Sequence, residues 1–194
     1  MVNKELKDFK NCLHSSLKAI QKGAYFVVKE QEEKSKIQEI KFNFDQKDDV
    51  LIIQQDVKNC PSITNLFGNN GDKIESCDFI VLLIKNKELK IFFCEIKSKN
   101  TEATRKKAEQ QIKSSKIFFE YLYKSYLHKY NKYNKNDDFS MAIENAKSLI
   151  LYPTSMSQKY SVASMSYGLI SCKMELDDNR VCYIADGYKF FESK

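Results

Sequence analysis

The stretch of sequence from Cys77 to Lys97, CDFIVLLIKNKELKIFFCEIK, decides the fold. It holds two runs rich in β-branched and aromatic residues, Cys77–Lys85 and Leu89–Lys97, with the polar turn Asn86-Lys87-Glu88 between them. Two such runs on either side of a short polar turn are typical of a β-hairpin. The stretch therefore predicts two antiparallel strands, and the apolar character of both predicts that they are buried.

Charged side chains are placed at one end of this hairpin. Antiparallel pairing brings Asp78, at the start of the first strand, to the end where Glu95 and Lys97 lie. Side chains alternate along a strand, so Glu95 and Lys97 share one face, with their Cα atoms about 6.5 Å apart. Charged groups at the end of an apolar strand are costly to desolvate unless they are paired or bind a ligand.

Two carboxylates and a lysine in one place have a clear chemical use. Carboxylate oxygens bind a hard cation such as Mg²⁺, whose other positions are filled by water and substrate phosphate. The cation polarises a phosphoryl oxygen and lowers the pKa of a bound water. A neighbouring lysine orients that water or stabilises the negative charge that develops. The three residues Asp78, Glu95 and Lys97 therefore predict phosphodiester hydrolysis.

The rest of the chain completes a mixed α/β pattern. Apolar residues at helical spacing predict a helix over Lys4–Ile20. Short β-like runs follow at Ala24–Val28, Ile37–Phe44 and Val50–Val57, and then a loop at Asn59–Asp72.

Beyond the hairpin, a long helix is expected from an N-cap at Thr101 or Asn100 to about Tyr130. A loop at Asn131–Asp138 and further strands are expected after it, at Ser148–Tyr152, Ser166–Leu176, Arg180–Ala185 and Tyr188–Phe191. We predict one α/β domain over residues 1–194, with a core of about 1–153 and a C-terminal strand extension over 154–194.

Asp78, followed after sixteen residues by Glu95-Ile96-Lys97, resembles the D-x(n)-(D/E)-x-K signature of the PD-(D/E)xK nuclease superfamily. That superfamily includes restriction endonucleases and Holliday-junction resolvases. The order of a hairpin and a following helix also matches its αβββαβ core, and the resemblance covers about Ile74–Leu122. Cys77 stands where many members have proline.

The resemblance implies a restriction-endonuclease-like fold and a role for each residue of the motif. Asp78, Glu95 and the carbonyl of Ile96 would bind Mg²⁺ or Mn²⁺, and Lys97 would be the catalytic lysine. Many members also carry a glutamine in the next helix, for which Gln111 is the match.

Some positions and alternatives stay open. Gln110 is an alternative to Gln111, and Glu5 and Asp8 are candidates for the helix-borne acid that some families add. Asp56-Val-Lys58 follows another apolar run and is a reserve site.

The activity implied is that of a metal-dependent endonuclease acting on DNA, with RNA as an alternative substrate. A role in restriction or antiviral (anti-phage) defence is an expectation from the resemblance alone. So small a chain leaves little room for a specificity domain, so we expect a homodimer or a subunit of a larger complex. The alternatives are a catalytically inactive nuclease-fold module that binds nucleic acid or a protein, and an unrelated α/β protein in which Glu95 and Lys97 form a surface ion pair.

Composition narrows the class of protein further. The formal net charge is +6, from 32 Lys and Arg against 26 Asp and Glu, which suits a polyanionic partner only weakly. The longest apolar run, Phe79–Ile84, is too short to span a bilayer, so no membrane partner is expected.

Six cysteines without a C-x-x-C pair predict reduced thiols in a cytoplasmic protein, and with only two histidines a structural zinc site is not expected. Tyrosines and lysines are interleaved between Phe118 and Asn134, a composition that could stack on bases and contact phosphates. The helical spacing of Phe119, Tyr123, Tyr126 and Tyr130 favours instead an aromatic face directed to the core, with the lysines in solvent.

Overall fold

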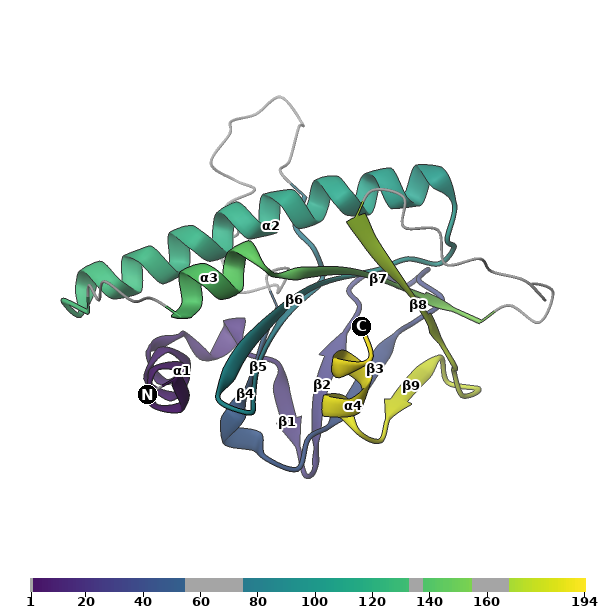
Figure 1. Ribbon diagram of the computed structural model, residues 1–194. Helices are drawn as coiled ribbons and strands as arrows, with labels where there is room; N and C mark the ends of the chain where they lie inside the picture. Colours follow the sequence, from purple (N-terminus) through teal and green to yellow (C-terminus); the bar gives the residue numbers. More distant parts are fainter. Residues whose placement is uncertain (1, 55–74, 133–137, 155–167) are drawn as a thin grey trace.

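The computed structural model describes residues 2–54, 75–132, 138–154 and 168–194 (Figure 1). Its strands form two sheets. Sheet A has the order β4 (Val50–Gln54), β5 (Phe79–Lys85), β6 (Glu88–Ile96), β7 (Lys147–Pro153), β8 (Leu169–Met174). Sheet B has the order β1 (Ile20–Lys22), β2 (Tyr25–Lys29), β3 (Glu39–Asn43), β9 (Val181–Ile184). The α-helices in the described ranges are α1 (Val2–Cys12), α2 (Glu102–Lys129), α3 (Asp138–Glu144) and α4 (Gly187–Glu192).

Both sheets are mixed, which confirms the α/β class. In sheet A, β4, β5 and β6 pair antiparallel, whereas β6, β7 and β8 pair parallel. In sheet B, β9 lies parallel to β3 beside two antiparallel pairs. The expected C-terminal extension thus supplies one edge strand to each sheet, β8 to sheet A and β9 to sheet B.

The predicted hairpin is β5 and β6, paired from Phe79 with Cys94 to Lys85 with Glu88. Its turn is Asn86-Lys87, and both residues have positive φ angles of 52° and 66°. Two central residues with positive φ match the type I′ turn, whose twist fits that of the flanking strands. The turn therefore fixes the register that carries through to the opposite end of the hairpin.

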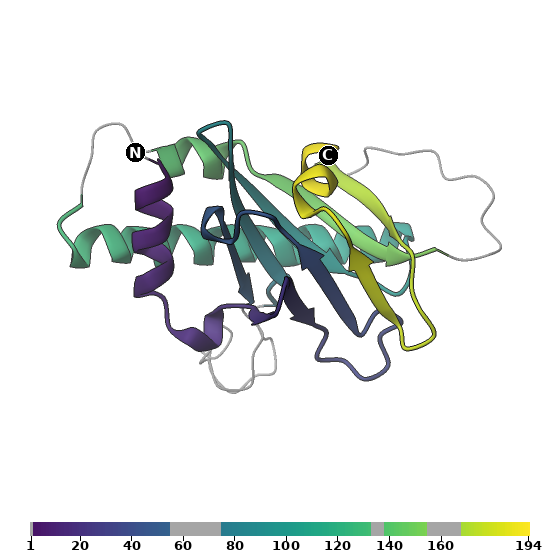
Figure 2. The same ribbon diagram turned by 90° about the horizontal axis from the view of Figure 1, so that it is seen from below.

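Sheet A is buried on both faces, which explains the unbroken apolar character of β5. One face, with Ile80 and Leu82, packs beneath helices α1, α2 and α3. The other face, with Phe79 and Val81, packs against sheet B and α4. The result is a helical layer, sheet A and sheet B in succession; seen from below, the strands of sheet B lie in front of α2 (Figure 2).

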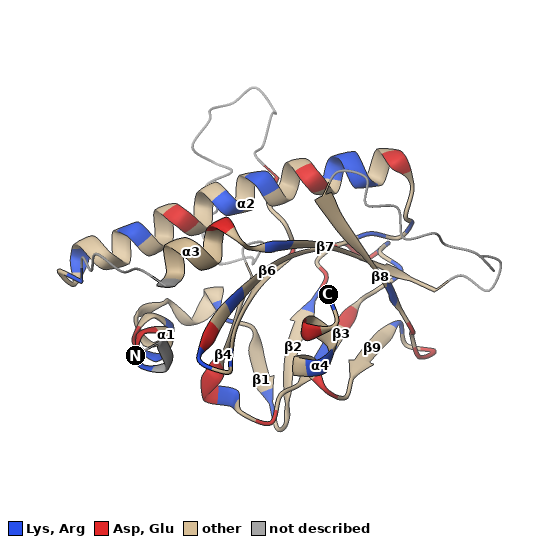
Figure 3. Ribbon diagram, viewed as in Figure 1, with Lys and Arg blue, Asp and Glu red and all other residues tan. Residues whose placement is uncertain are grey.

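Helix α2 begins at the predicted N-cap, because Thr101 accepts a hydrogen bond from the backbone N–H of Thr104. The expected core-facing aromatic residues Phe119, Tyr123 and Tyr126 are buried. Tyr130 is 44% exposed, so that part of the prediction is wrong; Tyr130 lies just past the last helical residue. Basic and acidic residues are distributed along the whole length of α2 (Figure 3).

The predicted helix Lys4–Ile20 is too long. Helix α1 ends at Cys12, and a short 3₁₀ turn over Ser15–Leu17 follows, capped by the His14 side chain. Leu17 is buried although it lies outside α1, so the apolar spacing there reports burial rather than helix. Ile20 instead begins the edge strand β1.

Tyr188–Phe191, expected as a strand, belongs to the helix α4. Asp186 caps this helix by accepting a hydrogen bond from the backbone N–H of Lys189 at 2.9 Å. Tyr188 and Phe191 are both buried. Their separation of three residues matches one turn of a helix, whereas buried residues of a strand alternate at every second position. A Cβ at Gly187 would lie 2.4 Å from the Phe44 ring, so the close packing of α4 needs glycine there.

Several further predictions concern short or undescribed segments. Helix α3 was not predicted, although Phe139, Ala142 and Ile143 are buried at helical spacing. The expected loop Asn59–Asp72 and the reserve pair Asp56 and Lys58 lie outside the described residues.

Cys77, Cys94, Cys172 and Cys182 are buried free thiols, whereas Cys12 is exposed. Within the described ranges, no helix is both long and apolar enough to cross a membrane.

Candidate active site at the open end of the hairpin

The structure brings four of the sequence-predicted site residues together where β5 begins and β6 ends. Lys97 forms an ion pair with Glu95 through Nζ and Oε1. The same Nζ donates a hydrogen bond to Oε1 of Gln111, at 2.8 Å. Gln111 in turn donates from Nε2 to the carbonyl of Ser76 at 3.3 Å, two residues before Asp78. Helix α2 is thus tied through Gln111 to the segment before β5 and to the residue after β6.

Each of the two carboxylates accepts a hydrogen bond from a backbone N–H on the other side of the hairpin. The regular ladder ends at the pair of Phe79 with Cys94. Beyond it, the Ile96 N–H donates to Oδ2 of Asp78 at 2.6 Å, and the Asp78 N–H donates to Oε2 of Glu95 at 3.2 Å. These two reciprocal bonds fix the orientation of both carboxyl groups relative to the strands, because each is anchored to a backbone amide of the opposite strand.

Burial makes this arrangement electrostatically costly. Glu95 is only 2% exposed, and burial raises its pKa to about 7, although the charge of Lys97 opposes the shift. Burial also raises the pKa of Asp78 well above its usual range, and repulsion from the Glu95 charge adds to that shift. Two neighbouring carboxylates that resist ionisation in this way are stabilised in the charged form by a cation between them.

The donor atoms fit a hard cation such as Mg²⁺. Asp78 and Glu95 supply carboxylate oxygens. The N–H and C=O groups of a strand residue point to the same edge, so the Ile96 carbonyl lies on the same side as its N–H, which reaches Asp78. In the described part of the chain, no cluster of three or more His, Cys, Asp and Glu residues could hold a metal. Two carboxylates and a carbonyl suit Mg²⁺ nevertheless, because that ion retains several waters and binds substrate phosphate.

The structure distinguishes between the two candidate glutamines. Gln110 is exposed on α2, whereas Gln111 is half-buried and bonded to Lys97. One helical turn further on, buried Ser115 accepts a hydrogen bond from the Cys77 N–H at 2.7 Å. Ser115 was not predicted, and it fixes the backbone directly before Asp78. The only sequence signal that could have identified Ser115 is a serine among the apolar residues on the core-facing side of α2.

Glu30 is a second residue that the sequence analysis missed. It follows β2 of sheet B directly, and its charge raises the pKa of both Asp78 and Glu95. Its Oε1 accepts hydrogen bonds from the N–H groups of Gln31 and Glu32 at 2.7 and 3.1 Å. An acid at a strand end was visible in the sequence, but the packing of sheet B against sheet A was not.

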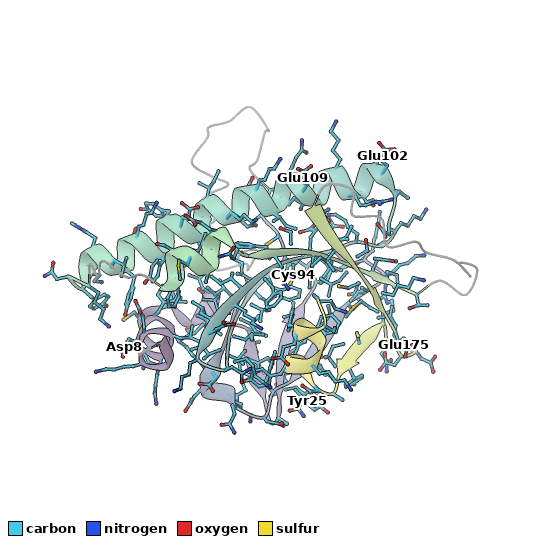
Figure 4. The ribbon with its side chains drawn as sticks, in the orientation of Figure 1. Asp8, Tyr25, Cys94, Glu102, Glu109 and Glu175 are labelled. Carbon is cyan, nitrogen blue, oxygen red and sulfur yellow. The ribbon has the colours of Figure 1, made fainter. Side chains whose placement is uncertain are left out.

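The candidate helix-borne acids lie elsewhere. Glu5 accepts a hydrogen bond from the Tyr123 hydroxyl at 2.8 Å, and Asp8 pairs with Lys132 at 2.7 Å. Tyr123 lies twelve residues beyond Gln111 on α2, which is about 18 Å along the helix axis. In Figure 4, Asp8 on α1 lies toward the end of α2 opposite to the labelled Glu102, where α2 begins. The structure therefore does not bring either acid to the site.

Comparison of the chain with protein-family models, with curated proteins and with solved structures gave no match in any of the three.

Proposed function

We propose that the protein is a metal-dependent endonuclease of the PD-(D/E)xK type that hydrolyses phosphodiester bonds of DNA. The observation that carries the proposal is the convergence of Asp78, Glu95, Lys97 and Gln111 through direct hydrogen bonds. A chance ion pair at a strand end would not need a second buried carboxylate beside it, nor a helix residue that orients the lysine.

Each residue has a role that follows from its contacts. Asp78, Glu95 and the Ile96 carbonyl would hold Mg²⁺ or Mn²⁺, which when bound polarises the phosphoryl group and acidifies a water. Lys97 carries three N–H donors, of which Glu95 and Gln111 take two. The third is left to orient the attacking water or to stabilise charge on the phosphoryl oxygens. Gln111 is a positioning residue, since it acts through Lys97.

The direct test is cleavage of supercoiled plasmid, single-stranded DNA and RNA by the purified chain, in Mg²⁺ and in EDTA. We expect nicking or linearisation of DNA in Mg²⁺ and none in EDTA, because the carboxylates bind no substrate phosphate without a bridging cation. A preparation that binds DNA with strong salt dependence but cuts neither DNA nor RNA would contradict the proposal and favour an inactive binding module on this fold.

Removal of the Gln111 side chain is expected to slow cleavage about 10- to 100-fold, which corresponds to one hydrogen bond to a charged group, about 1.5–3 kcal/mol. The measurement is kcat on a fluorescent duplex for Gln111→Ala. Gln110→Ala is the matched control, because Gln110 is exposed next to it and should behave as the wild type. Equal rates for the two variants would remove Gln111 from the site.

A further inference from the structure

A basic pocket of about 490 Å³ is lined in part by the residues that directly follow Lys97 in the chain. Its wall begins with Ser98, the residue after Lys97, and continues through Lys99, Asn100 and Thr101 to the start of α2. Lys36, from the segment between β2 and β3, and Arg180, from the turn before β9, close it on the side of sheet B. Three cations from three separate segments therefore meet around one hollow.

The positive charge of this pocket is not neutralised within the described residues. No Asp or Glu of the described ranges lines the pocket, and none there forms an ion pair with Lys36, Lys99 or Arg180. Arg180 is held in place because its Nη1 donates to the carbonyl of Ser35 at 3.2 Å. The positive end of the α2 helix dipole lies at Thr101 and adds to the same field. Such a pocket favours an anion.

The size of the pocket favours an anion larger than phosphate alone. Asn100 lines it, and its Nδ2 donates a hydrogen bond to Oγ of Ser171 at 3.3 Å, which holds this wall in place. The pocket volume of about 490 Å³ exceeds what one phosphate fills. A nucleotide carries a sugar and a base next to its phosphate and would occupy the remaining space.

We propose that the basic pocket binds a nucleotide of the substrate strand next to the phosphodiester held at Asp78 and Glu95, with Lys36, Lys99 and Arg180 on its phosphate. This inference rests on the proposed nuclease function, since it takes that site as the place of cleavage. The separation fits, because Lys97 and Asn100 are three residues apart, which is at most about 11 Å between Cα atoms. The pocket would therefore position the substrate strand and so determine which phosphodiester bond is cut.

The test measures binding without cleavage. In EDTA, the anisotropy of a labelled single-stranded oligonucleotide is followed across a salt series for the wild type and for Lys36→Ala/Lys99→Ala. We expect roughly tenfold weaker binding and a salt slope smaller by about 1.4, since each lost phosphate contact on a single strand contributes about 0.7. Lys36→Arg/Lys99→Arg should restore both values, which separates lost charge from misfolding. Probes with and without a 5′-phosphate distinguish a terminal phosphate from an internal one.

Lys4→Ala/Lys7→Ala is the matched control, because it removes two positive charges from α1, at the other end of α2. Wild-type affinity and slope in the Lys36→Ala/Lys99→Ala protein, or an equal loss in the control, would overturn the pocket proposal. Cleavage in Mg²⁺ is assayed in parallel. If the wild type cleaves and the Lys36→Ala/Lys99→Ala protein binds as tightly as the wild type, the pocket proposal alone is refuted. If the wild type never cleaves but the double variant loses binding, the nuclease proposal is refuted and the pocket remains an anion site.

Discussion

Replacement of Glu95 by Gln is expected to reduce Mg²⁺-dependent cleavage of DNA about a thousandfold while the protein remains folded. Glutamine keeps the size of the side chain and an oxygen that can accept the Asp78 N–H. It removes the negative charge that would bind the proposed cation and that pairs with Lys97. A loss of this size is typical when a charged group is removed from a preorganised site.

Glu88→Gln is the matched control for this variant, because Glu88 lies on the same strand β6 but is exposed at the hairpin tip. Single-turnover rates on a labelled duplex, with saturating Mg²⁺, compare the two variants with the wild type. Cleavage by Glu95→Gln within about threefold of the Glu88→Gln rate would refute the role given to Glu95, since it is far below the expected effect.

The metal-free protein is expected to be more stable at about pH 5 than at about pH 8 because of Glu95. Burial raises the Glu95 pKa from its ordinary value of 4.5 to about 7, so the folded state binds this proton more tightly than the unfolded state. The stabilisation is fully present below pH 4.5 and is lost as the pH rises through 7. The shift corresponds to about 2–3 kcal/mol between the two pH values, or about 5–10 °C in Tm for a chain of this size.

Thermal unfolding in EDTA at the two pH values measures this effect. The contribution of other titrating groups to the change in Tm is subtracted by comparison with Glu95→Gln. The difference in Tm between pH 5 and pH 8 should shrink in that variant. Mg²⁺ should raise the wild-type Tm at pH 8, because it favours the ionised carboxylates, and should do so far less in Glu95→Gln. An identical pH dependence in wild type and variant would show that Glu95 titrates as an ordinary surface acid.

The hairpin and the long helix could be predicted from the sequence because their signals are local. The two apolar runs around Asn86-Lys87 and the cap at Thr101 need no knowledge of the rest of the chain. Helix α4 and the end of α1 could not be predicted in this way. Their aromatic and leucine residues are buried by sheet packing, and an apolar residue indicates burial without indicating which local structure buries it.

The candidate site followed the same division. Asp78, Glu95 and Lys97 were found because strand alternation and antiparallel pairing place them without any tertiary information. Glu30 was missed because its charge comes near the two acids only through the packing of one sheet on another. Glu5 and Asp8 were wrong candidates, because the sequence does not tell where α1 packs in the helix layer. The contacts of Glu5 with Tyr123 and of Asp8 with Lys132 place α1 away from the open end of the hairpin.

The reciprocal bonds between Asp78, Glu95 and the backbone have a consequence for how this chain can change. The two acids make the last hydrogen bonds of the β5–β6 pairing, so the alignment of the strands sets the relative position of the two carboxyl groups. A shift of one residue in that alignment would turn the side chains of one strand to the opposite face and separate the carboxyl groups. The Asn86-Lys87 turn is therefore coupled to the geometry of the carboxyl groups at the far end of the hairpin, and we expect an insertion in the turn to be tolerated only where it leaves the strand alignment untouched.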